Sequence, residues 1–325
     1  MTSPYASWAS SHLKEADLLK NFKAGDVRAL ARAISLVERR DPALRRIEEA
    51  LRDSQRSPGV AGFTGAPGTG KSTIVDAVVT LLRGQNKSVA VLATDPNSPF
   101  TGGAILGDRI RMQRHALDPK VFIRSMGARG HLGGLSLATR EAIRLLGAFG
   151  FDPVILETVG VGQSELEVAA VADTTIVVLT PNLGDGVQMI KAGILEIADI
   201  FVVNKADLEG SNRAVTELRG MLSLSNTPGA PRVWKPPIIA TSAARDEGID
   251  KLWEAVLAHR RHLESSGRNR ELARQRLEDE TAEVAAEIAR HRVRRALAED
   301  PALAERLVAD GTPYGTAEEI LDRKR

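Results

Sequence analysis

The segment "GFTGAPGTGKST" (residues 62–73) joins a short apolar run to a glycine-rich turn and then to a helical pattern. Its glycines, lysine and serine have the spacing G-x-x-x-x-G-K-[ST], which is typical of a phosphate-binding loop. In such a loop, backbone N–H groups and the helix N-terminus contact phosphate oxygens, the lysine reaches the terminal phosphates and the hydroxyl binds Mg²⁺. The strand and helix context disfavours the alternative, a glycine turn with an incidental lysine. The expected binding residues are Gly65, Ala66, Pro67, Gly68, Thr69, Gly70, Lys71, Ser72 and Thr73.

Short apolar runs alternate with helical patterns along the middle of the chain. Runs without a polar alternate are typical of strands buried on both faces, and the spacing between these runs leaves room for crossover helices. The sequence therefore predicts an α/β fold with a mostly parallel sheet, whose ligands bind at the carboxyl ends of the strands. The predicted strands are "VAGFT" from residue 60, "VAVLAT" from 89, "VFIRS" from 121, "VILET" from 154, "TIVVLT" from 175, "IFVVNK" from 200 and "PIIATSA" from 237.

Helical patterns flank the predicted sheet on both sides. Between Asp26, a candidate N-cap, and Arg39, the apolar residues Val27, Leu30, Ala31, Ile34 and Val37 fall on one helical face. After residue 249 the pattern is helical to the end of the chain. We therefore predict an N-terminal helical segment over residues 1–57, a nucleotide-binding domain over 58–262 and a C-terminal helical extension over 263–325.

The composition excludes several classes of protein. Lys and Arg number 44 against 42 Asp and Glu, a balance that points away from nucleic acid and anionic membranes as partners. There is no cysteine, so disulfides and thiolate metal ligands are impossible, which fits a reducing compartment. No apolar run reaches the ~18 residues that span a bilayer, and the N-terminus lacks the marks of a signal or transit peptide. We expect a cytoplasmic protein.

The segment "VVNKADL" follows the sixth predicted strand and supplies Asn204, Lys205 and Asp207. A carboxylate there accepts hydrogen bonds from the ring N–H and the exocyclic amine of guanine, while Lys205 lies along the base. Adenine lacks that pair of donors, and a buried Asp207 would be left unpaired against it. The sequence therefore predicts GTP rather than ATP. The segment "TSA" follows the next strand, where the backbone at Ser242 and Ala243 can meet the guanine O6.

Three acids are candidates for the magnesium shell or for orienting the attacking water. Asp95 and Asp108 lie in the loop "TDPNSPFTGGAILGDRIRM" (residues 94–112), and Glu157 ends the fourth predicted strand. Carboxylates suit a hard cation, and Ser72, Asp95 and Glu157 are the predicted metal residues. In the alternative reading Asp95 caps a turn before Pro96 and Asp108 caps the next helix.

The segment "ETVGVGQSE" (residues 157–165) has a valine, Val161, where an activatable GTPase often has a water-positioning glutamine. Val161 cannot orient water. Gln163 and Glu165 follow, either as substitutes or as ordinary residues of a first helical turn. The isolated protein is therefore expected to hydrolyse GTP slowly.

Two further groups of residues can be interpreted either as functional or as ordinary structural residues. Asp185, Gln188 and Lys191 share one face of a predicted helix start, which is either a functional surface or an ordinary solvated turn. His259 and His262 lie three residues apart on an arginine-rich helix, and we expect surface residues there rather than metal ligands. Trp234 and Trp253 are expected to be packing residues.

Taken together, the phosphate loop, "TGG" and "LGD" after Asp95, "ETVGVGQSE", "GDGVQMIKAGILEIAD" and "NKAD" resemble the MeaB/ArgK/MMAA family of GTPases. Members of that family are accessory chaperones of cobalamin-dependent acyl-CoA mutases. The resemblance implies a P-loop G domain with N-terminal helices and a C-terminal helical arm that forms a homodimer. It also implies that GTP gates the delivery and protection of adenosylcobalamin, which the mutase binds.

The resemblance assigns roles to individual residues. Lys71 and Ser72 hold phosphates and Mg²⁺, with Asp95, Asp108 and Glu157 around the metal and the water. The Asp95 loop and residues 157–165 resemble switches I and II. Residues 185–191 resemble a third switch that senses the mutase, which gives Lys191 a catalytic role.

The identity of the client mutase stays open at this point. Ala104 and Arg109 resemble the G domain of fused isobutyryl-CoA mutases more than methylmalonyl-CoA mutase chaperones, so methylmalonyl-, isobutyryl- and 2-hydroxyisobutyryl-CoA mutases are all candidates. A cobalamin adenosyltransferase is a further candidate partner. Two other classes compete: a nickel-insertion GTPase, which usually brings cysteine or clustered histidine, and a P-loop small-molecule kinase, for which no substrate base is identified.

Overall fold

A computed structural model describes residues 16–54, 57–95, 112–127, 134–158, 164–181, 194–224 and 234–323. The chain divides into two compact units, Met1–Asn269 and Arg270–Arg325, and each unit is described by itself. Within the described residues, no helix is both long enough and apolar enough to cross a membrane.

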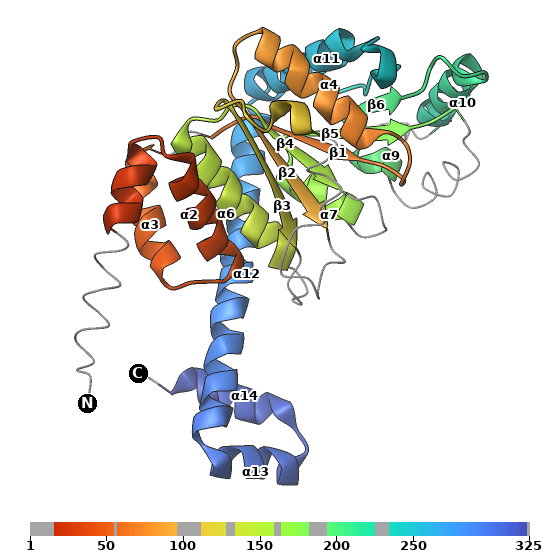
Figure 1. Cartoon of the computed structure of the whole chain (residues 1–325). Coiled ribbons are helices and arrows are strands. Elements are labelled where there is room, and N and C mark those ends of the chain that lie inside the picture. The colour runs from red at the N-terminus through yellow and green to blue at the C-terminus, as the bar shows by residue number, and fades with distance from the viewer. Residues whose placement is uncertain are drawn as a thin grey trace. The chain divides into compact units, whose positions relative to one another are not determined.

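The first unit is built on a seven-stranded sheet with the order β3-β2-β4-β1-β5-β6-β7 (Figure 1). All recorded strand pairings are parallel. Each predicted apolar run forms one strand, so the predicted α/β fold is confirmed. The strands are β1 (Val60–Thr64), β2 (Val89–Asp95), β3 (Val121–Gly127), β4 (Val154–Thr158), β5 (Thr174–Leu179), β6 (Ile200–Val203) and β7 (Ile238–Ala240).

Helices cover both faces of the sheet, which explains why the central strands are buried at every position. On one face lie α4 (Lys71–Gly84) and α11 (Ile249–Ser265), which share a buried cluster with Phe63 and Ile155. The opposite face carries α6 (Gly134–Phe149), α7 (Ser164–Val171), α9 (Ile194–Ile197) and α10 (Ser211–Leu224). Short 3-10 turns complete the unit at η1 (Arg52–Ser54), η2 (Gln113–His115) and η3 (Ala243–Arg245).

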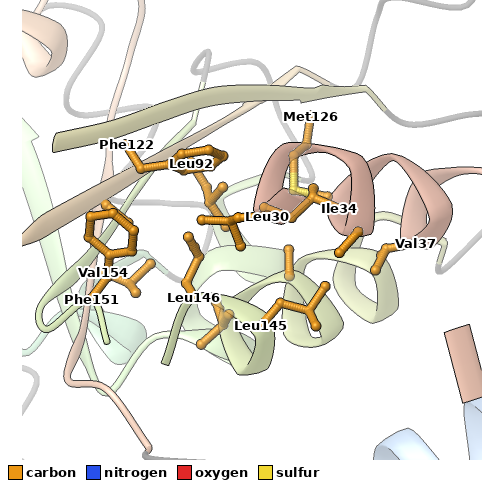
Figure 2. Close-up of a cluster of buried hydrophobic side chains, with 14 of the residues drawn as sticks. Leu30, Ile34, Val37, Leu92, Phe122, Met126, Leu145, Leu146, Phe151 and Val154 are labelled. Carbon is orange, nitrogen blue, oxygen red and sulfur yellow. The ribbon is translucent and has the colours of Figure 1, made fainter. Parts of the chain in front are cut away.

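The N-terminal helices add a layer outside α6 and β3 (Figure 1). Residues 16–23 are helical, followed by α2 (Val27–Glu38) and α3 (Ala43–Leu51). The predicted N-cap is present, since a carboxylate oxygen of Asp26 accepts a 2.8 Å hydrogen bond from the N–H of Arg28. Figure 2 shows Leu30, Ile34 and Val37 of α2 packed against Leu145 and Leu146 of α6.

One residue of the predicted apolar face of α2 is misplaced. Val27 is 37% exposed, whereas Leu30, Ala33, Ile34 and Val37 are fully buried. At 100° per residue, Val27 lies roughly 90° from the centre of the buried stripe. It therefore sits at the edge of the contact with α6, and its assignment to the buried face was wrong.

Polar contacts fix the same N-terminal helices to the sheet. The Arg124 guanidinium, on edge strand β3, donates to the carbonyl oxygen of Ala31 at 2.9 Å, to Ser35 Oγ at 3.0 Å and to Glu38 Oε2 at 2.5 Å. Arg40 forms a further 2.7 Å ion pair with Glu141 of α6. The Arg124 guanidinium thus contacts α2 over its second half and links this helix to the edge strand.

The second unit is helical throughout its described residues. It contains most of α12 (Arg268–Glu299), then α13 (Pro301–Asp310) and α14 (Pro313–Asp322). Asp300 caps α13 by accepting a 3.1 Å hydrogen bond from the N–H of Leu303, and Gly311 ends that helix in the left-handed conformation. Leu303 and Ile320 are buried, whereas Ile288 on α12 is 46% exposed.

Candidate functional site

The phosphate loop connects β1 to α4 at the carboxyl edge of the sheet, as predicted. Two of its glycines have no room for a side chain. A Cβ at Gly65 would lie 2.3 Å from the carbonyl oxygen of Val178, and a Cβ at Gly70 would lie 2.4 Å from Asn204 Nδ2. Gly70 also has φ +89°, in the left-handed region that glycine favours. The loop therefore depends on glycine for its backbone path and for its contact with β5 and β6.

The first two residues of α4 are Lys71 and Ser72, and both are buried. Lys71 Nζ donates hydrogen bonds to the carbonyl oxygens of Gly65 at 2.7 Å and Ala66 at 3.0 Å. The ammonium group is thus held inside the loop. A cavity of about 470 Å³ opens beside it, lined by Pro67, Gly68, Gly70, Lys71, Ser72, Thr73, Ala93, Glu157, Thr158 and Lys205.

Ser72 and Glu157 meet on the wall of this cavity. Ser72 Oγ donates a short hydrogen bond to Glu157 Oε1, and β4 places Glu157 there because it lies directly beside β1 in the sheet. A hydroxyl and a carboxylate oxygen are ligands that Mg²⁺ accepts, so the donor set fits the predicted metal. Among the described residues there is no group of three or more His, Cys, Asp or Glu that could hold an ion. Mg²⁺ commonly uses substrate phosphates and waters for its remaining positions.

Asn204 joins the phosphate loop to the predicted guanine-binding segments. Its Nδ2 donates to the carbonyl oxygen of Thr69 at 2.8 Å. Its Oδ1 accepts hydrogen bonds from Thr241 Oγ1 at 3.1 Å and from the N–H of Ala243 at 3.2 Å. Lys205 adds a second link, because its Nζ donates to the carbonyl oxygen of Gly68 at 2.9 Å. The three sequence motifs, far apart in the chain, form one hydrogen-bonded group.

Asp207 is held by two side chains from the segment after β7. Its Oδ1 accepts a 2.7 Å hydrogen bond from Ser242 Oγ, and Arg245 Nη2 lies 3.6 Å from its Oδ2. The Ser242 hydrogen bond is the main cause that lowers the pKa of Asp207 below its ordinary value. The carboxylate is therefore ionised and oriented as an acceptor. Sequence reasoning missed Arg245 and the hydroxyl of Ser242, because only the backbone of "TSA" was considered.

Several predicted site residues lie outside the part of the chain that the structure describes. Asp108, Val161, Gln163 and Lys191 belong to this group, as does the whole of the 185–191 segment. The backbone of Asp95 ends β2, opposite Gly127 of β3, but its side chain is not described. Glu165 belongs to α7 under the same limit. Their predicted roles stay predictions.

His259 is a buried residue, which makes the expectation of a surface histidine wrong. It is 3% exposed, and its Nδ1 lies 2.9 Å from Thr174 Oγ1 while its Nε2 lies 3.4 Å from Asp199 Oδ1. The ring centroid of Trp234 lies 4.9 Å away. The cluster lies at the amino end of β5, opposite the phosphate loop. Burial, together with the charge of His262, lowers the pKa of His259 to about 4.

Comparison with known proteins identifies the family to which this site belongs. Residues 30–299 match the family model described as methylmalonyl-CoA mutase-associated GTPase MeaB. The chain is 46% identical over 308 residues to a predicted GTPase of Pyrococcus horikoshii, covering 94% of this chain and 97% of the relative. It is 39% identical to the GTPase ArgK of Escherichia coli over 265 residues, which are 80% of each chain.

A solved structure gives the same result for the fold. The structure described as an LAO/AO transport system kinase superposes with a TM-score of 0.70 and 27% identity, covering 95% of this chain and 97% of that chain. The family match includes the phosphate loop, Glu157 and the Asn204–Asp207 segment. The chain belongs to the MeaB family of methylmalonyl-CoA mutase-associated GTPases.

Proposed function

We propose that this protein is a GTP-hydrolysing chaperone that gates the loading and protection of adenosylcobalamin in an acyl-CoA mutase. The main support for the proposal is that hydrogen bonds join the phosphate loop to the Asn204–Asp207 segment. The chain also matches a mutase-associated GTPase family over residues 30–299. The client is of the methylmalonyl-, isobutyryl- or 2-hydroxyisobutyryl-CoA type. That mutase, rather than this chain, binds the cobalamin.

The described residues divide the binding of GTP between them. The phosphate loop and the N-terminus of α4 hold the phosphates, and Lys71 exchanges its loop carbonyls for phosphate oxygens. Asp207 accepts the two guanine N–H groups, while Lys205 and the backbone around Ser242 and Ala243 line the base. Mg²⁺, when bound with GTP, neutralises charge that develops on the phosphates. Ser72, Glu157 and Asp95 are the proposed metal residues.

The hydrolysis rate is proposed to depend on the mutase. Val161 cannot position water, and Asp108 is the proposed orienting acid, so the isolated protein hydrolyses GTP slowly. The 185–191 segment, and Lys191 in it, is the proposed sensor of the partner. A partner that completes the site decides when GTP is cleaved.

Single-turnover GTP hydrolysis, with and without the purified mutase, tests this regulation. Lys191→Ala should leave nucleotide affinity nearly unchanged and remove most of the stimulation by the mutase. Lys251→Ala, at an exposed position on α11, is the matched control. Full stimulation of the Lys191 variant would show that Lys191 does not sense the mutase. Fast hydrolysis by the wild type alone would refute the inference from Val161.

The client is identified by capture from cells of the source organism. The tagged protein, loaded with a non-hydrolysable GTP analogue, should retain a cobalamin-dependent mutase subunit, with or without an adenosyltransferase. An Asp207→Asn variant, which binds the analogue poorly, serves as the control. Recovery of hydrogenase or urease maturation factors instead would support the nickel-insertion class and contradict the proposal.

We further propose a homodimer formed through the C-terminal helical extension, residues 263–325. On α12, Leu277, Val284 and Ile288 fall on one face of the helix, and Leu277 and Ile288 are 60% and 46% exposed. Val293 and Leu297 lie on the opposite side of the helix. An exposed stripe of this kind is typical of an interface. A chain that ends before Glu264 should be monomeric by light scattering, and a truncated chain that remains dimeric would refute this arm as the interface.

A P-loop small-molecule kinase is a second candidate, because the similar solved structure is described as a transport system kinase. The two candidates differ in nucleotide and in product. The GTPase predicts a strong preference for guanine and release of inorganic phosphate. Tight ATP binding, or transfer of the γ-phosphate to a small acceptor, would favour the kinase.

A further inference from the structure

Two buried threonine hydroxyls meet at the carboxyl edge of the sheet, beside the cavity. Thr64 ends β1 and Thr158 ends β4, and their Oγ1 atoms lie 3.2 Å apart. Their exposed fractions are 0% and 1%. Thr158 Oγ1 also lies 3.5 Å from the carbonyl oxygen of Phe63. Thr64 leads directly into the phosphate loop, and Thr158 directly follows Glu157.

The two threonine side chains connect β1 to β4 one residue beyond the last recorded backbone pairing of these strands. The recorded register of β1 and β4 runs from Val60 opposite Val154 to Phe63 opposite Glu157. At the next residue of each strand, the link is the hydrogen bond between the two threonine hydroxyls. This bond therefore joins the strand that leads to the phosphate loop with the strand that carries Glu157, at the place where the cavity opens.

The fold by itself does not favour hydroxyls at these positions. On β1 and β4 themselves, the other residues of this face are Val60, Gly62, Val154 and Leu156, and none of them has a polar side chain. Valine has the shape of threonine and a strong preference for strands, and burying a hydroxyl removes its hydrogen bonds to water. A matched pair of hydroxyls can be replaced by apolar groups of the same shape at little cost to stability. Their presence therefore requires a reason other than packing.

That reason lies in the contact between Ser72 and Glu157. Ser72 is positioned by the phosphate loop, which begins after Thr64, and Glu157 is positioned by the end of β4. A change in the spacing of the two strand ends would move Glu157 relative to Ser72. We propose that Thr64 and Thr158 are positioning residues for GTP hydrolysis: their hydrogen bond sets the position of Glu157 against Ser72 and so determines the rate. This inference rests on the proposed GTPase function.

Valine substitutions separate positioning from packing. Thr158→Val removes the hydroxyl that donates to buried Thr64 Oγ1 and should lower the Tm by about 2 to 4 °C. Thr64→Val leaves the Thr158 hydroxyl with only the 3.5 Å contact to the Phe63 carbonyl oxygen and should lower the Tm by less. The double variant removes both hydroxyls and should recover the wild-type Tm. All three variants should bind GDP within about twofold of wild type and hydrolyse GTP about tenfold more slowly in a single turnover, since misplaced groups act on the chemical step. Each variant should also need more Mg²⁺ for half-maximal rate.

Two further variants complete the design. Thr158→Ser keeps the hydroxyl and should retain most of the wild-type rate. Thr175→Val removes a buried hydroxyl at the amino end of β5, away from the cavity, and should leave the rate and the Mg²⁺ requirement unchanged. Losses should not multiply in the double variant, because both substitutions remove one interaction.

The outcomes decide between the alternatives. A double variant that regains both its Tm and its rate would show that the hydroxyls act only in packing and would overturn the inference. The same conclusion follows if Thr175→Val slows hydrolysis as much as the other variants do. If the wild type neither binds nor hydrolyses GTP, the proposed function itself fails. If the wild type hydrolyses GTP and the valine variants do so at the same rate, only the positioning role of the two threonines fails.

Discussion

Asn204 Nδ2 donates a 2.8 Å hydrogen bond to the carbonyl oxygen of Thr69, across 135 residues of sequence. Asn204 lies directly after β6, next to Lys205 and Asp207, which are proposed to bind the base. Thr69 lies in the turn of the phosphate loop. The same amide group accepts hydrogen bonds from Thr241 and Ala243. A single side chain therefore holds together the parts of the site that are proposed to bind the base and the phosphates.

Asn204→Ala should weaken GTP and GDP binding by at least about tenfold, because the substitution removes three hydrogen bonds from a buried position and leaves their partners unsatisfied. The measurement is a fluorescent-nucleotide titration together with the melting temperature. Asn212→Ala, at an exposed position on α10, is the control and should match the wild type. Wild-type affinity of the Asn204 variant would mean that the link is dispensable.

Gly70→Ala should abolish nucleotide binding. The new Cβ would lie 2.4 Å from Asn204 Nδ2, on a backbone with φ +89° that side chains rarely adopt. Gly84→Ala is the matched control, since a Cβ at that helical position would meet nothing within 4 Å. The control should bind normally and gain up to about 1 kcal/mol in unfolding free energy. Equal affinities of the two variants would show that the loop adapts.

Asp207→Asn should shift the nucleotide preference from guanine towards xanthine. The carboxylate offers two acceptors to guanine, whereas the amide offers one acceptor and one donor, and the C2 oxygen of xanthine can accept from that donor. Competition of GTP and XTP for the labelled nucleotide measures the change. Asp246→Asn, an exposed neighbour, should keep the wild-type preference, and unchanged discrimination by the Asp207 variant would contradict the assignment.

His259 should make the protein less stable as the pH falls from about 6.5 to about 4. Its pKa in the folded state is about 4, below the ordinary 6.5, mainly because the ring is buried. The unfolded chain takes up the proton first, so the stabilisation is complete above pH 6.5 and is lost as the pH falls towards 4. The full difference is about 3 kcal/mol.

Urea unfolding at several pH values tests this dependence. His259→Gln, which does not titrate, should show a weaker loss of stability over that pH range than the wild type. His291→Gln, at an exposed position on α12, should follow the wild-type curve. If the wild type and His259→Gln lose stability in parallel, the imidazole is not the group responsible.

Much of the fold follows from local patterns in the sequence. The strands were predictable because a parallel sheet covered on both faces needs continuous apolar runs, and the phosphate loop because its glycines are required locally. Val27 was misplaced because periodicity gives a helical face but not the limits of the helix that covers it. His259 was misjudged because its partners, Thr174 and Asp199, come from other elements.

The finer features of the site were less predictable for a related reason. The Thr64–Thr158 pair and the Ser242–Asp207 bond join residues far apart in the chain, so no short motif contains both partners. The sequence does place each of these residues at the carboxyl end of a strand. That placement is a signal, because the ends of parallel strands meet at one edge, but the specific partners depend on the order of the strands in the sheet.

The layer formed by α2 over α6 and edge strand β3 has a consequence for how the protein can be handled. Leu30, Ile34 and Val37 cover apolar side chains of α6, and the Arg124 guanidinium donates hydrogen bonds to the backbone and side chains of α2. A chain shortened to begin at the phosphate-loop strand would present this apolar surface and an uncompensated arginine to solvent. Such a fragment would be prone to self-association and precipitation during expression, so the N-terminal helices are needed to obtain a soluble nucleotide-binding domain.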